Sequence, residues 1–141
     1  MSTLTSSFRS LGLGAVAGLR SMTAPAAAFS LRDRRIAVPL ALLAAGELVA
    51  DKLPVTPSRL APPSLALRLA SGALCGWIVA DAFEGNRPLG LVCGALGAAV
   101  ASYGGYYLRQ AIVTHGPLPD TVVAIGEDGL ALALAAIAIR R

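Results

Sequence analysis

An uncharged segment runs from Leu89 to Leu108 and reads LGLVCGALGAAVASYGGYYL. A helix needs about 20 mainly apolar residues to cross the hydrocarbon core of a bilayer. This segment has that length and contains no Asp, Glu, Lys or Arg. It therefore predicts a transmembrane helix, and the rest of the chain has to be interpreted around it.

The composition agrees with a membrane location. Of 141 residues, 55% are hydrophobic and only 14% are charged, whereas a soluble domain has roughly 25% charged residues. The mean hydropathy is +0.67, and the 15 glycines suit close helix packing. We predict an all-α fold with one integral membrane domain over residues 1–141, a polytopic bundle of about five transmembrane helices.

Four further apolar segments complete the predicted bundle. Their ranges are Phe8–Ser30, Arg35–Leu53, Pro63–Ala82 and Thr121–Ile139. Pro25 predicts a break in the first of them, because a proline interrupts helix hydrogen bonding. The alternative for this segment is a cleaved secretory signal, with Arg9 before its apolar stretch.

Five spans would place the two termini on opposite sides of the membrane. The arginines and lysines between spans lean toward a cytoplasmic C-terminus. Short similarities, such as AGELVAD and IGEDGLA, also suggest that helices 1–2 and 4–5 form an inverted repeat, an arrangement common in transporters.

The acidic residues within or beside the spans are the first candidate site residues. Glu47 and Asp51 are four residues apart and share a helix face. Asp51 and Lys52 precede Pro54 and are expected to mark the membrane–water interface. Glu47 lies one turn deeper, and we expect it to face inward, toward Arg20 or the last helix.

Glu127 and Asp128 lie inside the last span, where an unpaired charge costs at least ~2.5 kcal/mol. Adjacent helical residues point about 100° apart, so we expect one to face the bundle and the other a neighbouring helix or subunit. Gly126 and Gly129 flank them and would let another backbone come close.

Arg20 is the natural counter-charge for these acids. Ser21 and Thr23 follow it and can bond to backbone groups freed near Pro25. The broken helix also offers an N-terminus that can bind an anion. Two interpretations remain open: a substrate- or ion-binding site, or a structural salt bridge that locks the bundle.

Other features bear on packing and partners. Three small-xxx-small pairs predict close helix contacts and a homodimer: Gly14–Gly18, Gly72–Gly76 and Gly90–Gly94. Three tyrosines near the end of the fourth span (103, 106 and 107) are either an interfacial anchor or the wall of a cavity. Asp120 is expected to cap the last helix.

Several stretches together resemble a bacterial membrane-protein family, domain of unknown function four-one-two-six. They are AGLRSMTAPA, GELVADKLPVTPSR, RLASGALCG, YYLR and LPDTVVAIGEDGLAL, which cover nearly the whole chain in the family's order. The resemblance implies a small all-helical integral membrane protein and brings no activity, substrate or catalytic residues.

We expect no enzymatic activity, because the sequence has neither a nucleophile beside a histidine base nor a nucleotide-binding motif. We also expect no metal or other cofactor, and no nucleic-acid partner, since its basic residues are scattered. The leading hypothesis is a transporter or channel for a small solute or ion in the inner (plasma) membrane, proton-coupled through its acids. The alternative is a structural or accessory membrane protein that binds lipid or a partner.

Overall fold

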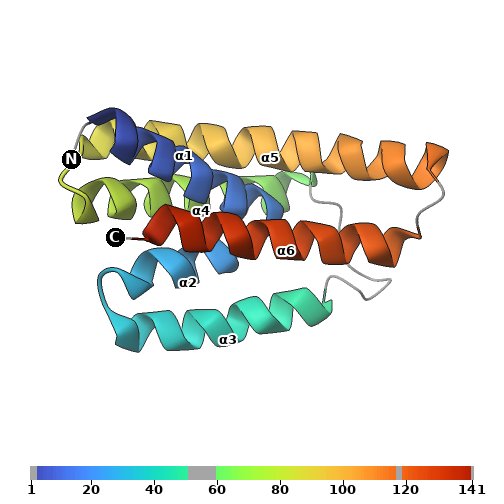
Figure 1. The fold of residues 1–141 in the computed structure, drawn as a ribbon, viewed down its shortest axis with the longest axis horizontal. Coiled ribbons are helices and arrows are strands. Elements are labelled where there is room, and N and C mark those ends of the chain that lie inside the picture. The colour runs from blue at the N-terminus through green and yellow to red at the C-terminus, as the bar shows by residue number, and fades with distance from the viewer. Residues whose placement is uncertain (1–2, 51–59, 117–118, 141) are drawn as a thin grey trace.

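The computed structural model describes residues 3–50, 60–116 and 119–140, and all regular structure in these ranges is helical. The helices lie side by side as a bundle (Figure 1). They are α1 (Thr3–Leu19), α2 (Thr23–Ser30), α3 (Arg34–Ala50), α4 (Pro62–Ala82), α5 (Arg87–His115) and α6 (Asp120–Ile139). This part of the chain thus has six helices instead of about five, because the first expected span is divided in two. Asp51 and Lys52 lie outside the described residues.

The core of the bundle is formed by α1, α4 and α5, which contact one another through glycine. A Cβ atom added at Gly14 would collide with the carbonyl oxygen of Gly94, and one at Gly76 with that of Gly90. Only glycine permits such close backbone approach. The small-xxx-small pairs are therefore used within one chain, so they no longer argue for a homodimer.

The first expected span is a helical hairpin. α1 ends at Leu19, and after Arg20–Met22 the chain turns back, so that α2 returns toward the end where α1 began (Figure 1). The break thus precedes Pro25, which lies in the first turn of α2. Proline is tolerated there, because the N–H groups of a first turn have no partner inside the helix.

This reversal changes the topology expected from the sequence. Both termini lie at the same end of the bundle (Figure 1), and Arg9 of α1 donates to the carbonyl oxygens of Ala138 (3.2 Å) and Arg140. α1 also runs parallel to α5, since Gly14 lies at Gly94 and Gly18 at Ala98. The expected inverted repeat requires these helices to run in opposite directions, so it is wrong for this pair.

Three helices, α4, α5 and α6, are long and apolar enough to span a membrane. α5 continues to His115, beyond the end of the apolar segment at Leu108. Its start is fixed by Asn86, whose side chain accepts a hydrogen bond from the N–H of Leu89 (3.0 Å). α3 lies at the edge of the bundle against α2, and most of its residues are exposed.

Candidate functional site at the hairpin tip

The tip of the α1–α2 hairpin, Arg20–Met22, is a short non-helical segment inside the bundle. The end of α1 leaves carbonyl groups, and the start of α2 leaves N–H groups, without partners in their own helices. Buried backbone groups of this kind need hydrogen bonds from elsewhere. The surrounding helices supply them, and together with the tip these side chains form what we call the tip network.

Glu47 of α3 binds the N–H groups at the tip. Its carboxylate accepts hydrogen bonds from the Ser21 N–H (2.8 Å), the Ser21 hydroxyl (2.7 Å) and the Met22 N–H (2.8 Å). The expectation that Glu47 faces inward is confirmed, but the groups that it binds belong to the turn itself. The N–H groups that lead into α2, those of Ser21 and the N-cap residue Met22, are therefore bound by a carboxylate of the same chain.

Arg20 forms an ion pair with Asp128 of α6. The Arg20 side chain is only 2% exposed and that of Asp128 13%. A charge that is this deeply buried needs an opposite charge beside it. This pair connects the hairpin to the last helix. Thr23 is also buried, at the first position of α2.

Three residues of the tip network were missed by the sequence interpretation. The Arg68 guanidinium donates to the Gly18 carbonyl oxygen (2.9 Å), and the Ser102 hydroxyl donates to the same oxygen (3.3 Å). The Ser71 hydroxyl donates to the Ser21 carbonyl oxygen (3.0 Å). Arg68 lies inside the apolar segment Pro63–Ala82, and an arginine in such a segment is itself a sign of a buried partner.

The second acid of the last span has a different partner. Glu127 faces Arg109 of α5 (3.5 Å), which also binds Asp120 through two hydrogen bonds of 2.8 and 2.7 Å. The expected division of Glu127 and Asp128 between two directions is confirmed. The N-cap position of α6 is Pro119, and Asp120, expected to cap this helix, lies in its first turn, where its carboxylate binds the Arg109 guanidinium bidentately.

The structure thus brings five of the seven predicted site residues to one place: Arg20, Ser21, Thr23, Glu47 and Asp128. Glu127 belongs to the neighbouring cluster with Arg109, and Asp51 lies outside the described residues. Gly126 and Gly129 have open space where a Cβ would lie, so no other part of the described chain packs closely on them.

The chemistry at the tip is that of mutual neutralisation. Each charged group bonds to an opposite charge or to backbone groups beside a helix end, and the hydroxyl groups of Ser21, Ser71 and Ser102 bond to carbonyl or carboxylate oxygens. Among the described residues, no group of three or more His, Cys, Asp or Glu is arranged to hold a metal ion.

Comparisons with protein-family models, with curated proteins and with solved structures found no match for this chain. The resemblance to domain of unknown function four-one-two-six therefore stays a prediction.

Proposed function

We propose that the chain is a multi-pass protein of the plasma membrane with a structural or accessory role, in which the tip network locks a helical hairpin inside the bundle. The observation that carries this proposal is the use of the tip's polar groups. The Glu47 carboxylate accepts three hydrogen bonds from the turn, and Arg20 is paired with Asp128. A site for a solute would need such groups to face an open cavity.

The depth of the tip explains why a lock is needed. Ser102, which bonds near the tip, lies ~22 Å along α5 from its start at Arg87, given a rise of 1.5 Å per residue. The hydrocarbon core of a bilayer is ~30 Å thick. The turn would then lie within the membrane, where a non-helical backbone is tolerated only when protein groups or water satisfy it.

The test compares single and paired replacements of Arg20 and Asp128. Asp128→Leu alone leaves a buried guanidinium charge, and Arg20→Met alone leaves a buried carboxylate. Removing one partner of a buried pair is strongly destabilising, whereas replacing both with apolar residues is often tolerated. If the pair acts as a structural lock, each single variant should lose thermal stability in detergent, and the double variant Arg20→Met with Asp128→Leu should recover most of that loss.

A matched control is the pair Arg87–Asp81 (2.6 Å), which joins the start of α5 to the end of α4 and whose side chains are 57% and 32% exposed. Arg87→Met and Asp81→Leu should each change stability little, alone or together, because exposed ion pairs contribute about 0–1 kcal/mol. Additive losses for Arg20→Met and Asp128→Leu, with no recovery in the double variant, would contradict the lock.

Transport of a small solute or ion is the second candidate, favoured by the helix ends at the tip. Helices broken at membrane depth form the binding sites of many transporters. A solute carboxylate could replace Glu47 at the N-terminus of α2, or Glu47 could carry a proton. Proton flux into liposomes that contain the protein and an entrapped pH-sensitive dye discriminates proton-coupled transport from a purely structural lock. A flux above that of empty liposomes, abolished by Glu47→Gln, would support transport in place of the lock.

A homo-oligomer in contact with membrane lipids also remains proposed for this chain. Support for it comes from the exposed apolar side chains of α3 and α6, among them Leu42, Leu43 and Ile137. Such faces suit lipid or a second copy equally well. Chemical crosslinking in native membranes would test for the second copy.

A further inference from the structure

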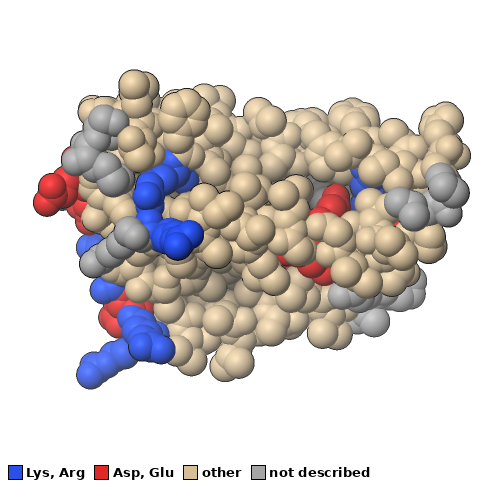
Figure 2. All heavy atoms as spheres, in the orientation of Figure 1, with Lys and Arg blue, Asp and Glu red and all other residues tan. Residues whose placement is uncertain are grey.

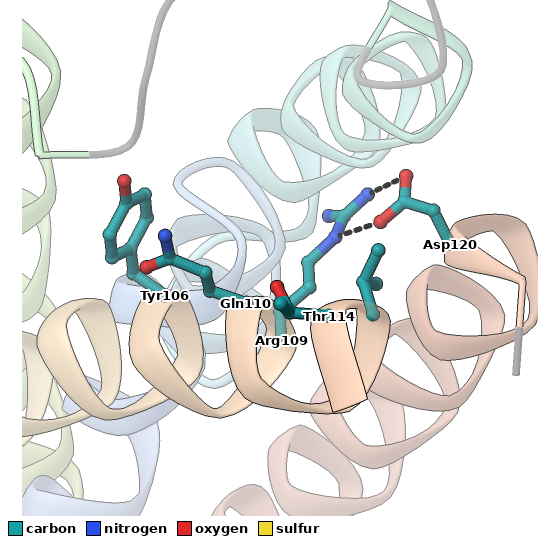
Figure 3. A pocket seen from close by; sticks show the side chains of 6 residues that line it. Tyr106, Arg109, Gln110, Thr114 and Asp120 are labelled. Carbon is teal, nitrogen blue, oxygen red and sulfur yellow. Dashed lines mark hydrogen bonds and ion pairs between the residues drawn. The ribbon is translucent and has the colours of Figure 1, made fainter. Parts of the chain in front are cut away.

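A pocket of about 260 Å³ lies between the C-terminal part of α5 and the first turn of α6 (Figure 3). Its wall is made of Tyr106, Arg109, Gln110, Val113, Thr114 and Asp120, and we call it the α5–α6 pocket. No residue of the hairpin tip lines it. Gln110, Val113, Thr114 and Asp120 are exposed, so the pocket opens to the surface of the bundle.

One wall of the pocket is a row of uncharged polar side chains. Tyr106, Gln110 and Thr114 are spaced by four residues, so they follow one face of α5. In the described part of the chain, none of these three side chains has a hydrogen-bond partner. Each can donate a hydrogen bond, from a hydroxyl or an amide N–H. The row is suited to an acceptor from outside the protein.

The opposite wall carries both signs of charge side by side. Figure 3 shows Arg109 and Asp120 joined by two hydrogen bonds, on the side of the pocket away from Tyr106. The Asp120 side chain is 57% exposed, so its carboxylate is accessible to an ammonium group in the pocket. The Arg109 guanidinium is paired with both Asp120 and Glu127, so this wall carries a net negative charge that favours an ammonium group, and the donor row is left to bind the anionic group. This pattern is complementary to a ligand with one anionic and one cationic group.

The position of the pocket along the α5 axis indicates whether such a ligand would be a lipid headgroup. Tyr106 and Thr114 lie ~29 and ~41 Å from the start of α5, given the helical rise. With a hydrocarbon core of ~30 Å, the pocket lies at the level of the lipid headgroups. Val113 in its wall and the exposed Leu108 and Val122 beside it give an acyl chain apolar surface to contact.

We propose that the α5–α6 pocket binds the headgroup of a zwitterionic phospholipid with a primary ammonium, a phosphatidylethanolamine. The phosphate oxygens accept hydrogen bonds from Tyr106, Gln110 and Thr114, and the ammonium donates to Asp120. This inference rests on the proposed membrane location, but it does not depend on the lock at the hairpin tip.

The experiment measures lipid retention by native mass spectrometry of the full chain in detergent. Phosphatidylethanolamine, phosphatidylglycerol and phosphatidylcholine are offered at equal concentration, and soluble phosphoethanolamine is offered separately. The wild type should retain phosphatidylethanolamine in preference to the other two lipids. Phosphatidylglycerol lacks the ammonium, and the choline group has no N–H to donate to Asp120.

Two variants test the assigned contacts. Gln110→Leu combined with Thr114→Val removes two exposed donors and should lower the affinity for phosphatidylethanolamine about tenfold, the effect of two ordinary hydrogen bonds. Tyr107→Phe is the control, because Tyr107 is on the same helix, is 60% exposed and does not line the pocket. It should bind lipid like the wild type.

The proposal is overturned if the double variant retains phosphatidylethanolamine as well as the wild type, or if all three lipids are retained equally. Soluble phosphoethanolamine that binds as strongly as the lipid when offered separately would identify a free solute as the ligand, and would also overturn the proposal. A failure of lipid binding leaves the coupling between Arg20 and Asp128 unchanged, so the two proposals are tested separately.

Discussion

Glu47 and Asp128 are both acidic side chains at the hairpin tip, but they bond to different kinds of group. Glu47 accepts hydrogen bonds from backbone N–H groups and a hydroxyl, whereas Asp128 faces the guanidinium of Arg20. Removing them therefore leaves different defects, neutral donors in one case and a buried positive charge in the other. The two losses should differ in size.

For Asp128→Asn we expect a loss of about 3–5 kcal/mol in the free energy of unfolding, because Arg20 stays buried without its opposite charge. Unfolding by a denaturing detergent, followed by circular dichroism, measures this loss. Asp81→Asn at the exposed pair is the control and should cost less than about 1 kcal/mol. Equal effects of the two substitutions would contradict the burial of the Arg20–Asp128 pair.

For Glu47→Ala we expect a smaller loss of about 1–3 kcal/mol, since the N–H groups at the turn lose their acceptor. Glu47→Gln should lie between Ala and the wild type, because its amide oxygen can still accept a hydrogen bond. Glu84→Ala, in the exposed turn after α4, is the control for losing a carboxylate and should be neutral. The same detergent titration ranks all three, and Glu47→Ala as stable as the wild type would refute the assigned contacts.

The polar residues at the tip were predictable in part. Charges inside apolar segments identify Arg20, Glu47 and Asp128 at the tip and Glu127 in the neighbouring cluster, because a charge within a membrane span is costly. Their pairing was not predictable, since it depends on how helices far apart in the sequence are arranged. Ser71 and Ser102 give almost no signal, because serine is common in tightly packed membrane helices.

Close packing of α1, α4 and α5 depends on individual glycines. Gly94 of α5 is so close to Gly72 of α4 that a Cβ added there would collide with the Gly72 carbonyl oxygen, whereas Gly104 on the same helix has open space. The same substitution at these two positions should have opposite effects on stability.

For Gly94→Ala we expect a loss of about 1–3 kcal/mol or failure to assemble, because backbone atoms have to move apart. For Gly104→Ala we expect no loss, and a gain of up to about 1 kcal/mol, since alanine favours a helix over glycine. Thermal unfolding in detergent compares the stabilities of these two variants, whose substitutions lie on the same helix. A neutral Gly94→Ala would show that α4 and α5 lie further apart than described.

Helix positions were largely predicted from the apolar segments, and the start of α4 differs by only one residue. The hairpin was not predicted. The break expected near Pro25 lies just before it, at Arg20–Met22. Hydropathy treats residues 8–30 as one segment, however, and contains no information about a reversal of direction. Hydropathy also ended the fourth span at Leu108, although α5 continues through Arg109 and Gln110 to His115.

The reversal at the tip determines the topology of the chain. The end of the bundle that holds both termini is rich in arginine (Figure 2). The described arginines there are Arg9, Arg32, Arg34, Arg35, Arg87 and Arg140, while Arg109 lies toward the opposite end. Arginine-rich loops favour the cytoplasmic side.

We therefore expect the N-terminus and the C-terminus both to face the cytoplasm. Reporter fusions at each end, one fluorescent only in the cytoplasm and one active only outside it, locate the termini independently. A fusion within the loop between α5 and α6 is the control and should report the opposite side. Termini on different sides would restore the five-span arrangement and contradict the hairpin.

The pairing of Arg20 with Asp128 also sets an order of events during synthesis. The two residues are 108 positions apart, and Arg9 bonds to Arg140 at the end of α6, 131 positions further along the chain. A nascent chain that has inserted only its first helices thus carries a guanidinium without the aspartate that neutralises it. If the bundle spans a membrane as proposed, we expect the hairpin to reach its final depth only after the last helix has been inserted. Chains truncated before Asp128 should consequently be recognised as incomplete and degraded, so that the final helix acts as a built-in check on completeness.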